Sequence, residues 1–154
     1  MIARGHAEAT GGLDWPGGAM TDDEIADPQV IPYLFYADAA TALEWLAHTF
    51  RFAVRTRDVR ADSTVRHAEL QLDRGGVIML GSAGPSFRGP GALGGTTQLV
   101  RITVADLRDH RNRTTAAGAT ASAIEIGPPG WISYSVTDPE GHQWYFTGPE
   151  HAEI

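Results

Sequence analysis

Residues 30–49, VIPYLFYADAATALEWLAHT, join a predicted strand to a predicted helix. Their first part, Val30–Tyr36, is a short apolar and aromatic run that favours a strand, and Pro32 places its start near a sheet edge. Asp38 is a preferred helix N-cap residue, so a helix is predicted from there to about Thr49. Its apolar residues recur at helical spacing on one face, which we expect to be buried: Ala39, Ala42, Leu43, Leu46 and Phe50.

Three further strands are predicted after this helix. Phe52–Arg57 is the first of them. Val65–Leu72 alternates strictly between apolar and polar residues, and the turn Arg74–Gly76 separates it from the apolar run Val77–Leu80. The order of this half of the chain is therefore strand, helix, strand, strand, strand.

The second half is predicted to repeat this order. A strand over Gln98–Val104 precedes a helix that Asp106 caps and that runs to about Ala117, with Gly118 at the position of a C-terminal glycine. Three strands then follow, the last two separated by the turn Asp138-Pro139-Glu140-Gly141: Thr120–Ile126, Trp131–Thr137 and Gln143–Thr147. Two tandem β-α-β-β-β units are the main organisational prediction.

The boundaries follow from this repeat and from composition. Residues 28–149 form one domain, with a first module at about 28–82 and a second at about 97–149. The Gly/Pro/Ser-rich stretch 81–96 supplies the connecting loop, at 83–96, which is either a functional flap or disordered. Residues 1–27 are predicted to be a flexible acidic leader, and 150–154 a tail.

Composition excludes several classes of function. The chain of 154 residues is 42% hydrophobic and 20% charged, which is typical of one globular domain. It has no cysteine, which excludes disulfides, zinc fingers, iron–sulfur clusters and thiol nucleophiles. All 12 basic residues are arginine, so Schiff-base chemistry and the P-loop lysine are excluded too.

Charge and hydropathy bear on partners and location. Of the net charge of −7, residues 1–27 carry −5, and neither part of the chain has a basic stripe, so no nucleic-acid partner is expected. No apolar run approaches the ~18 residues of a membrane helix, and the N-terminus does not resemble a signal peptide. We therefore expect no membrane partner and a cytoplasmic location.

Three stretches carry a resemblance to a known family: PYLFYADAATALEWL (32–46), HAELQLDRGGVIMLG (67–81) and YSVTDPEGHQWYFTG (134–148). With the tandem modules, they resemble the glyoxalase/bleomycin-resistance/dioxygenase branch of the vicinal oxygen chelate superfamily. The resemblance covers roughly residues 28–149. It implies an α+β fold in which two β-α-β-β-β modules form a cup-shaped curled sheet, and it implies a homodimer.

The resemblance also implies where a metal would bind. Enzymes of the superfamily hold a divalent metal with His or Gln from the first strand of each module and Glu from a last strand. Carried across, the last-strand positions are Met79 and Tyr145, and the first-strand positions lie near Ile31 and near Gln98 or Val100. Of these residues only Gln98 could be a ligand, whereas thioether, phenol and alkyl groups do not build such a site, so no metal and no cofactor are expected.

His67 and Glu69 are the best candidates for catalysis. They are two residues apart on a predicted strand, so their side chains project from the same face and could line the cup. The pair suits a general base with its orienting carboxylate, or two metal ligands at unusual positions. A structural role in the pocket wall is the third interpretation, and the favoured one.

The remaining candidates are aromatic or soft. Tyr134 and Tyr145 lie on neighbouring predicted strands and are expected to face the same cup, with Met79 opposite. A pocket wall of this kind would bind a planar or amphipathic ligand. The alternative is that these side chains simply pack in the hydrophobic core. The predicted ligand-binding set is His67, Glu69, Met79, Tyr134 and Tyr145.

The sequence therefore predicts metal-independent binding of a small aromatic or amphipathic molecule in the cup, as in sequestration or resistance proteins. The alternative is a metal-dependent lyase or dioxygenase whose ligands lie elsewhere, with His67, Glu69 and Gln98 converging on one ion. A regulatory or accessory domain with a closed cup is the third. The sequence leaves open whether the protein is an enzyme.

Overall fold

The computed structural model describes residues 27–151. Residues 1–26 of the predicted leader and 152–154 of the predicted tail lie outside the described part of the chain. Two β-α-β-β-β modules follow one another, as predicted, and the elements are β1 Tyr33–Tyr36, α1 Ala39–Phe50, β2 Ala53–Val59, β3 Val65–Gln71, β4 Val77–Ser82, α2 Pro90–Leu93, β5 Leu99–Thr103, α3 Leu107–Ala116, β6 Glu125–Ile126, β7 Trp131–Thr137 and β8 Gln143–Pro149.

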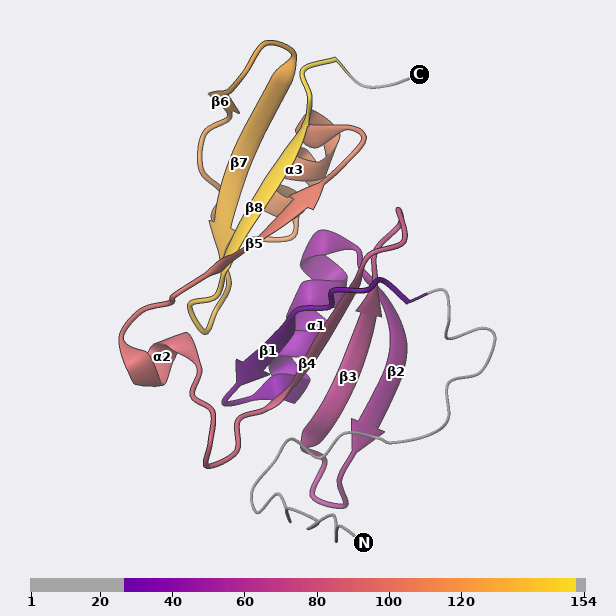
Figure 1. The fold of residues 1–154 in the computed structure, drawn as a ribbon, viewed down its shortest axis with the longest axis vertical. Coiled ribbons are helices and arrows are strands. Elements are labelled where there is room, and N and C mark those ends of the chain that lie inside the picture. Colours follow the sequence, from indigo (N-terminus) through magenta and orange to yellow (C-terminus); the bar gives the residue numbers. More distant parts are fainter. Residues whose placement is uncertain (1–26, 152–154) are drawn as a thin grey trace, which may run out of the picture.

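Each module builds its own four-stranded sheet. The strand orders are β1-β4-β3-β2 and β5-β8-β7-β6, which are equivalent in the two halves of the chain. In each sheet the first strand runs parallel to the last, and the other pairs are antiparallel. The two sheets follow one another along the long axis of the molecule without closing on each other (Figure 1). The α+β fold class is therefore confirmed.

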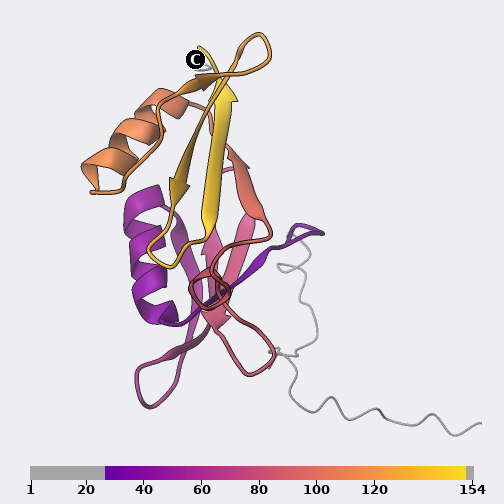
Figure 2. The ribbon, with the colours of Figure 1, turned by 90° about the vertical axis from the view of Figure 1, so that its left-hand side faces the viewer.

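Both long helices cover the same side of the molecule. Helix α1 packs on the first sheet and α3 on the second, and the two helices also contact each other (Figure 2). Among residues 27–151, no helix packs on the opposite side of either sheet, and we call this side the open face. Residues of one strand therefore alternate between the helix-covered core and the open face.

One hydrophobic core joins the two modules. Phe50, the last residue of α1, lies with its ring centroid 5.3 Å from that of Trp144 and 4.8 Å from that of Phe146, both on β8. Asp38 caps α1 by accepting a hydrogen bond from the Thr41 amide, as its position predicted. Among the described residues, no helix is long and apolar enough to span a membrane.

The predicted turn between β7 and β8 is a second junction between the modules. The buried carboxylate of Asp138 accepts hydrogen bonds from the Tyr36 hydroxyl at 2.6 Å and from the Trp144 indole N–H at 3.1 Å. Burial, and then the neighbouring Asp138 carboxylate, raises the pKa of Tyr36, so its hydroxyl remains a donor. Glu140 accepts from the backbone N–H groups of Ala37 and Asp38. The turn thereby holds the start of α1.

Two predicted elements differ from the observed ones. The strand predicted over 120–126 is reduced to Glu125–Ile126 and an isolated bridge at Ala121, because the Ser122 hydroxyl accepts the hydrogen bond of the Ser135 N–H. The predicted loop 81–96 contains the end of β4 and the four-residue helix α2. Gly118 has a φ of 98° and ends α3 as predicted.

Candidate functional site

The open face of the first sheet carries the predicted His67–Glu69 pair. Both residues lie on β3, and the Nε2 atom of His67 is 3.2 Å from a carboxylate oxygen of Glu69. The Nδ1 atom of His67 is 3.0 Å from the hydroxyl of Tyr33 on β1. His67 is only 5% exposed. Each of its ring nitrogens lies close to a side-chain partner on the sheet.

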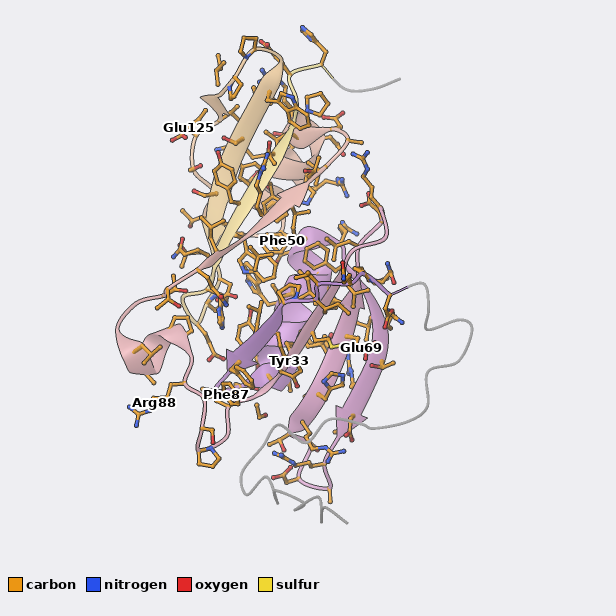
Figure 3. The ribbon with its side chains drawn as sticks, viewed as in Figure 1. Tyr33, Phe50, Glu69, Phe87, Arg88 and Glu125 are labelled. Atoms are coloured by element: carbon orange, nitrogen blue, oxygen red, sulfur yellow. The ribbon has the colours of Figure 1, made fainter. Side chains whose placement is uncertain are left out.

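Charged residues extend this contact across the sheet. The second carboxylate oxygen of Glu69 lies 3.6 Å from Nε of Arg55 on β2, and Arg55 also binds Asp27 at 2.6 Å. Burial raises the pKa of the Tyr33 phenol, which keeps it protonated beside His67, although the nearby Arg66 guanidinium opposes that shift. Tyr33 and Glu69 point from their strands toward the same open side (Figure 3).

Gly81 is a site residue that sequence reasoning missed. It lies on β4 between β1 and β3, and a Cβ atom built there would be 2.6 Å from the Tyr33 hydroxyl and 2.4 Å from the Arg66 carbonyl oxygen. Only a glycine lets the tyrosine cross the middle strand to reach His67. Tyr33 was missed as well, although its alternation with buried Leu34 and Tyr36 is the signal that puts it on the open face.

Met79 and a row of aromatic rings border the pair. Met79 lies directly beside Tyr33 in the sheet register and is nearly buried. The Tyr33 and Phe35 ring centroids are 5.0 Å apart, and Phe87 of the connecting loop stacks on Phe35 with ring centroids 4.1 Å apart. Of the predicted ligand-binding residues, His67, Glu69 and Met79 therefore lie on this sheet.

The second sheet carries a separate hollow on its open face. Its volume is about 350 Å³, and its lining includes Arg101, Pro128, Trp131, Ser133, Tyr145 and Thr147. Tyr145 donates a hydrogen bond from its hydroxyl to Ser133 Oγ at 2.8 Å, and Trp131 is 41% exposed. We call this the second-sheet hollow. Tyr145 lies in it, whereas Met79 lies on the other sheet.

Tyr134 does not share a face with Tyr145, and that expectation is wrong. The register of β7 and β8 pairs Tyr134 with Phe146 and Ser135 with Tyr145, so Tyr134 points toward α3. Its buried hydroxyl lies 2.6 Å from Nδ1 of His110 and 3.0 Å from Oγ1 of Thr114. Burial raises the pKa of Tyr134 to about 12. The residue therefore belongs to the core.

Comparison with known proteins places the chain in a family. No established protein-family model matches it. An uncharacterised protein of Mycobacterium bovis is 32% identical over 129 residues, which is 80% of this chain and 84% of the relative. The crystal structure of TioX from Micromonospora sp. ML1 matches at 34% identity with a TM-score of 0.63, over 82% of this chain and 100% of TioX. The chain belongs to the vicinal oxygen chelate superfamily.

More distant structures show the same superfamily fold. The bleomycin resistance determinant encoded on transposon Tn5 is 17% identical, with a TM-score of 0.62 over 80% of this chain and 99% of that protein. Other solved chains with this fold are described as a glyoxalase/bleomycin resistance protein, an antibiotic binding protein and a fosfomycin resistance protein.

The residues present do not fit the metal centre of the superfamily's enzymes. Tyr33 pairs with Met79 in the first sheet, and Arg101 pairs with Tyr145 at the equivalent place in the second. Phenol, thioether and guanidinium groups do not hold a divalent metal as imidazole and carboxylate groups do. Within residues 27–151, no three His, Asp or Glu side chains cluster as a metal site would require.

The predicted alternative metal set is also spread over the fold. His67 and Glu69 lie on β3 of the first sheet, whereas Gln98 is an exposed residue just before β5 of the second. Both ring nitrogens of His67 already face a side-chain partner. A metal at His67 would therefore have to displace Tyr33 or Glu69.

Proposed function

We propose that the protein binds a small planar aromatic or amphipathic molecule in the second-sheet hollow, without a metal and without chemical turnover. Two proteins with the same fold support this proposal, a bleomycin resistance determinant and an antibiotic binding protein. The observation that carries it is the lining of the hollow, where aromatic and basic side chains stand together on an open sheet face.

The lining supports a ligand with a flat apolar body. Trp131 is exposed over 41% of its surface and Tyr145 lines the same hollow, so both can offer ring surface to a flat molecule. Pro128 adds a rigid apolar edge. The volume of about 350 Å³ lies at the lower end of the range for small-molecule pockets.

Arg101 adds a polar preference. It lies next to Tyr145 in the register of β5 and β8, and its guanidinium can stack on a ring or donate hydrogen bonds to an acceptor. Ser133 and Thr147 supply further hydroxyl groups along the same wall. The ligand therefore combines an aromatic body with at least one oxygen acceptor.

The binding is proposed to be metal-independent because the residues at the strand positions of the superfamily's metal ligands lack suitable donor atoms. Met79 and Tyr145 occupy the two last-strand positions, and Tyr33 and Arg101 lie beside them. We also propose a homodimer, which the resemblance implies, and a cytoplasmic location. Both stay predictions, and light scattering on the purified protein measures the first.

The test is a binding assay with a matched pair of variants. Bleomycin and a panel of planar aromatic antibiotics are titrated calorimetrically into the wild-type protein, into Trp131→Ala and into Ile126→Ala. Ile126 is an exposed apolar residue of the same module, 76% accessible, and does not line the hollow. We expect one compound to bind, Trp131→Ala to weaken its binding by about tenfold or more, and Ile126→Ala to leave it unchanged. Equal effects of the two substitutions would contradict the proposal.

The alternative of a metal-dependent lyase or dioxygenase has its own test. The close contact of His67 with Glu69 is the observation that favours it. The purified protein is loaded with Zn²⁺, Ni²⁺, Mn²⁺ or Fe²⁺, and its metal content is then measured by elemental analysis. We expect no stoichiometric metal. Near-stoichiometric metal that is lost in His67→Ala would favour the enzyme instead.

A further inference from the structure

A second hollow lies on the helix-covered side, where the two modules meet. Its volume is about 300 Å³, and it is lined both by the segments that follow α1 and β3 and by residues from β5 to α3. The aromatic part of its wall comes from Phe50, Phe52 and His110, and its charged residues include Arg51, Asp73 and Arg113. We call it the junction hollow. It shares no lining residue with the second-sheet hollow.

His110 presents a polar atom in this apolar wall. Its Nδ1 atom is held by the Tyr134 hydroxyl at 2.6 Å, while Nε2 makes no hydrogen bond to any described residue. Within residues 27–151, no buried side-chain nitrogen or oxygen lacks a partner, so Nε2 must reach solvent. Because the ring is only 7% exposed and lines the junction hollow, we infer that Nε2 opens into it.

Arg51 occupies an unusual backbone conformation at the same hollow. It ends α1 with a φ of 63°, in the left-handed region where a helix C-terminus normally carries glycine. An arginine there costs folding free energy that a glycine would not. Such outliers often mark functional sites, and here the strained residue is an arginine that lines the hollow.

We propose that the junction hollow is a second ligand site, which binds a small aromatic carboxylate. The carboxylate lies between the Arg51 guanidinium and Nε2–H of His110, and the aromatic ring packs on Phe50 and Phe52. The hydrogen bonds of the neighbouring hydroxyls support this assignment. With Thr114 as the donor to the Tyr134 oxygen and Tyr134 as the donor to Nδ1, the ring proton of His110 lies on Nε2.

The surrounding charges define how the site responds to substitution. Burial, and then the Arg113 guanidinium, lowers the pKa of His110 to about 4, so the ring is neutral at pH 7 and offers the ligand a hydrogen bond from Nε2–H but no positive charge. Arg113 is paired with Asp109 at 2.8 Å, and Asp106 receives the Asp109 N–H as the cap of α3. Asp73 is the remaining acidic residue of the lining, and it opposes an anionic ligand.

The experiment titrates 2-naphthoate into the full-length protein by calorimetry at pH 7.5. We expect saturable binding at one site that Arg51→Gln weakens by about tenfold, since a charge-assisted hydrogen bond is lost. Asp73→Asn is expected to tighten binding about threefold, because it removes a like charge. Arg108→Gln is the matched control, since Arg108 is an exposed arginine of α3 outside the hollow. In protein with ¹⁵N-labelled histidine, the Nε2 resonance of His110 should move on binding.

Arg51→Gly separates binding from folding. This variant relieves the positive φ and removes the guanidinium, so its melting temperature should equal or exceed that of the wild type while its affinity falls. The proposal is overturned if 2-naphthoate does not saturate the wild-type protein, or if Arg51→Gln and Arg108→Gln act alike. It is also overturned if Trp131→Ala abolishes binding and Arg51→Gln does not, because the probe then occupies the second-sheet hollow.

Discussion

The Tyr33 hydroxyl lies 3.0 Å from Nδ1 of His67, and it reaches that atom by passing over Gly81. The two residues lie on β1 and β3, which are separated by β4, so the contact spans a whole strand. It orients the imidazole toward Glu69 and keeps a polar cluster at the surface of the first sheet. The missing side chain at Gly81 is therefore a structural requirement of this cluster.

Gly81→Ala should destabilise the protein and break this contact. The added Cβ atom would lie 2.4 Å from the Arg66 carbonyl oxygen and 2.6 Å from the Tyr33 hydroxyl, so the backbone or the tyrosine must move. We expect a loss of about 1–3 kcal/mol in the free energy of unfolding, measured in urea. Gly95→Ala is the control, because a Cβ atom there meets nothing within 4 Å. Equal stability of the two variants would contradict the role of Gly81.

Asp138→Asn should destabilise the junction between the modules. One carboxylate oxygen accepts from the Tyr36 hydroxyl and from the Trp144 indole N–H, and the other accepts from the backbone N–H groups of Glu140 and His142. An asparagine places an NH₂ group against one of these donor pairs. We expect a loss of about 2–3 kcal/mol in urea unfolding.

Glu140→Gln is the companion variant for this turn. It keeps an acceptor for only one of the N–H groups of Ala37 and Asp38, but both bonds are exposed and water can replace the lost acceptor, so about 1 kcal/mol is expected. The turn would be unimportant for the junction if Asp138→Asn unfolded at the same urea concentration as the wild type.

The stability of the protein should fall between pH 7 and pH 5, in part because of His110. Burial lowers the pKa of this ring to about 4, so between about pH 6.5 and pH 4 the unfolded chain binds a proton there that the folded chain does not. Unfolding is therefore favoured as the pH falls, and above about pH 6.5 the contribution vanishes. At pH 5 the difference in protonation of His110 lowers the free energy of unfolding by about 2 kcal/mol.

His110→Gln isolates this contribution. The variant lacks the titrating ring, so the change in its free energy of unfolding between pH 7 and pH 5 should be smaller than that of the wild type by about 2 kcal/mol. Urea unfolding at the two pH values measures it. An identical pH dependence in both proteins would show that His110 does not titrate differently on folding.

Replacing Arg51 should reveal the energetic cost of its backbone conformation. Arg51→Gly removes the strain of a φ of 63° and should raise the free energy of unfolding by about 1 kcal/mol. Arg51→Ala keeps the strain, removes the same guanidinium and should change stability little. Thermal unfolding of the two variants side by side measures the difference, and a more stable alanine variant would refute the strain.

Local signals in the sequence predicted most of the elements. Asp38 caps α1, Gly118 ends α3, and the alternation of 65–72 predicts β3, because each of these depends on neighbours within a few residues. Two elements were out of reach of such signals. Helix α2 has only four residues, too few for a helical period, and the Ser122 hydroxyl interrupts the strand predicted over 120–126.

The site was only partly predictable for the same reason. Alternation along β3 placed His67 and Glu69 on one face, since strand period is a local property. Whether Tyr134 shares a face with Tyr145 depends on the register between β7 and β8, which alternation within either strand does not specify. The register pairs Tyr134 with Phe146 and so buries it.

By itself, the sequence determined the two modules, the capped helices and the connecting turn. Only the tertiary structure decided which distant residues meet: Tyr33 with His67, 34 residues apart, and Tyr36 with Asp138, 102 residues apart. The physical reason is that caps, turns and strand period depend on neighbours in the chain. Register, the path of Tyr33 over Gly81 and the junction between modules depend on how separate elements pack.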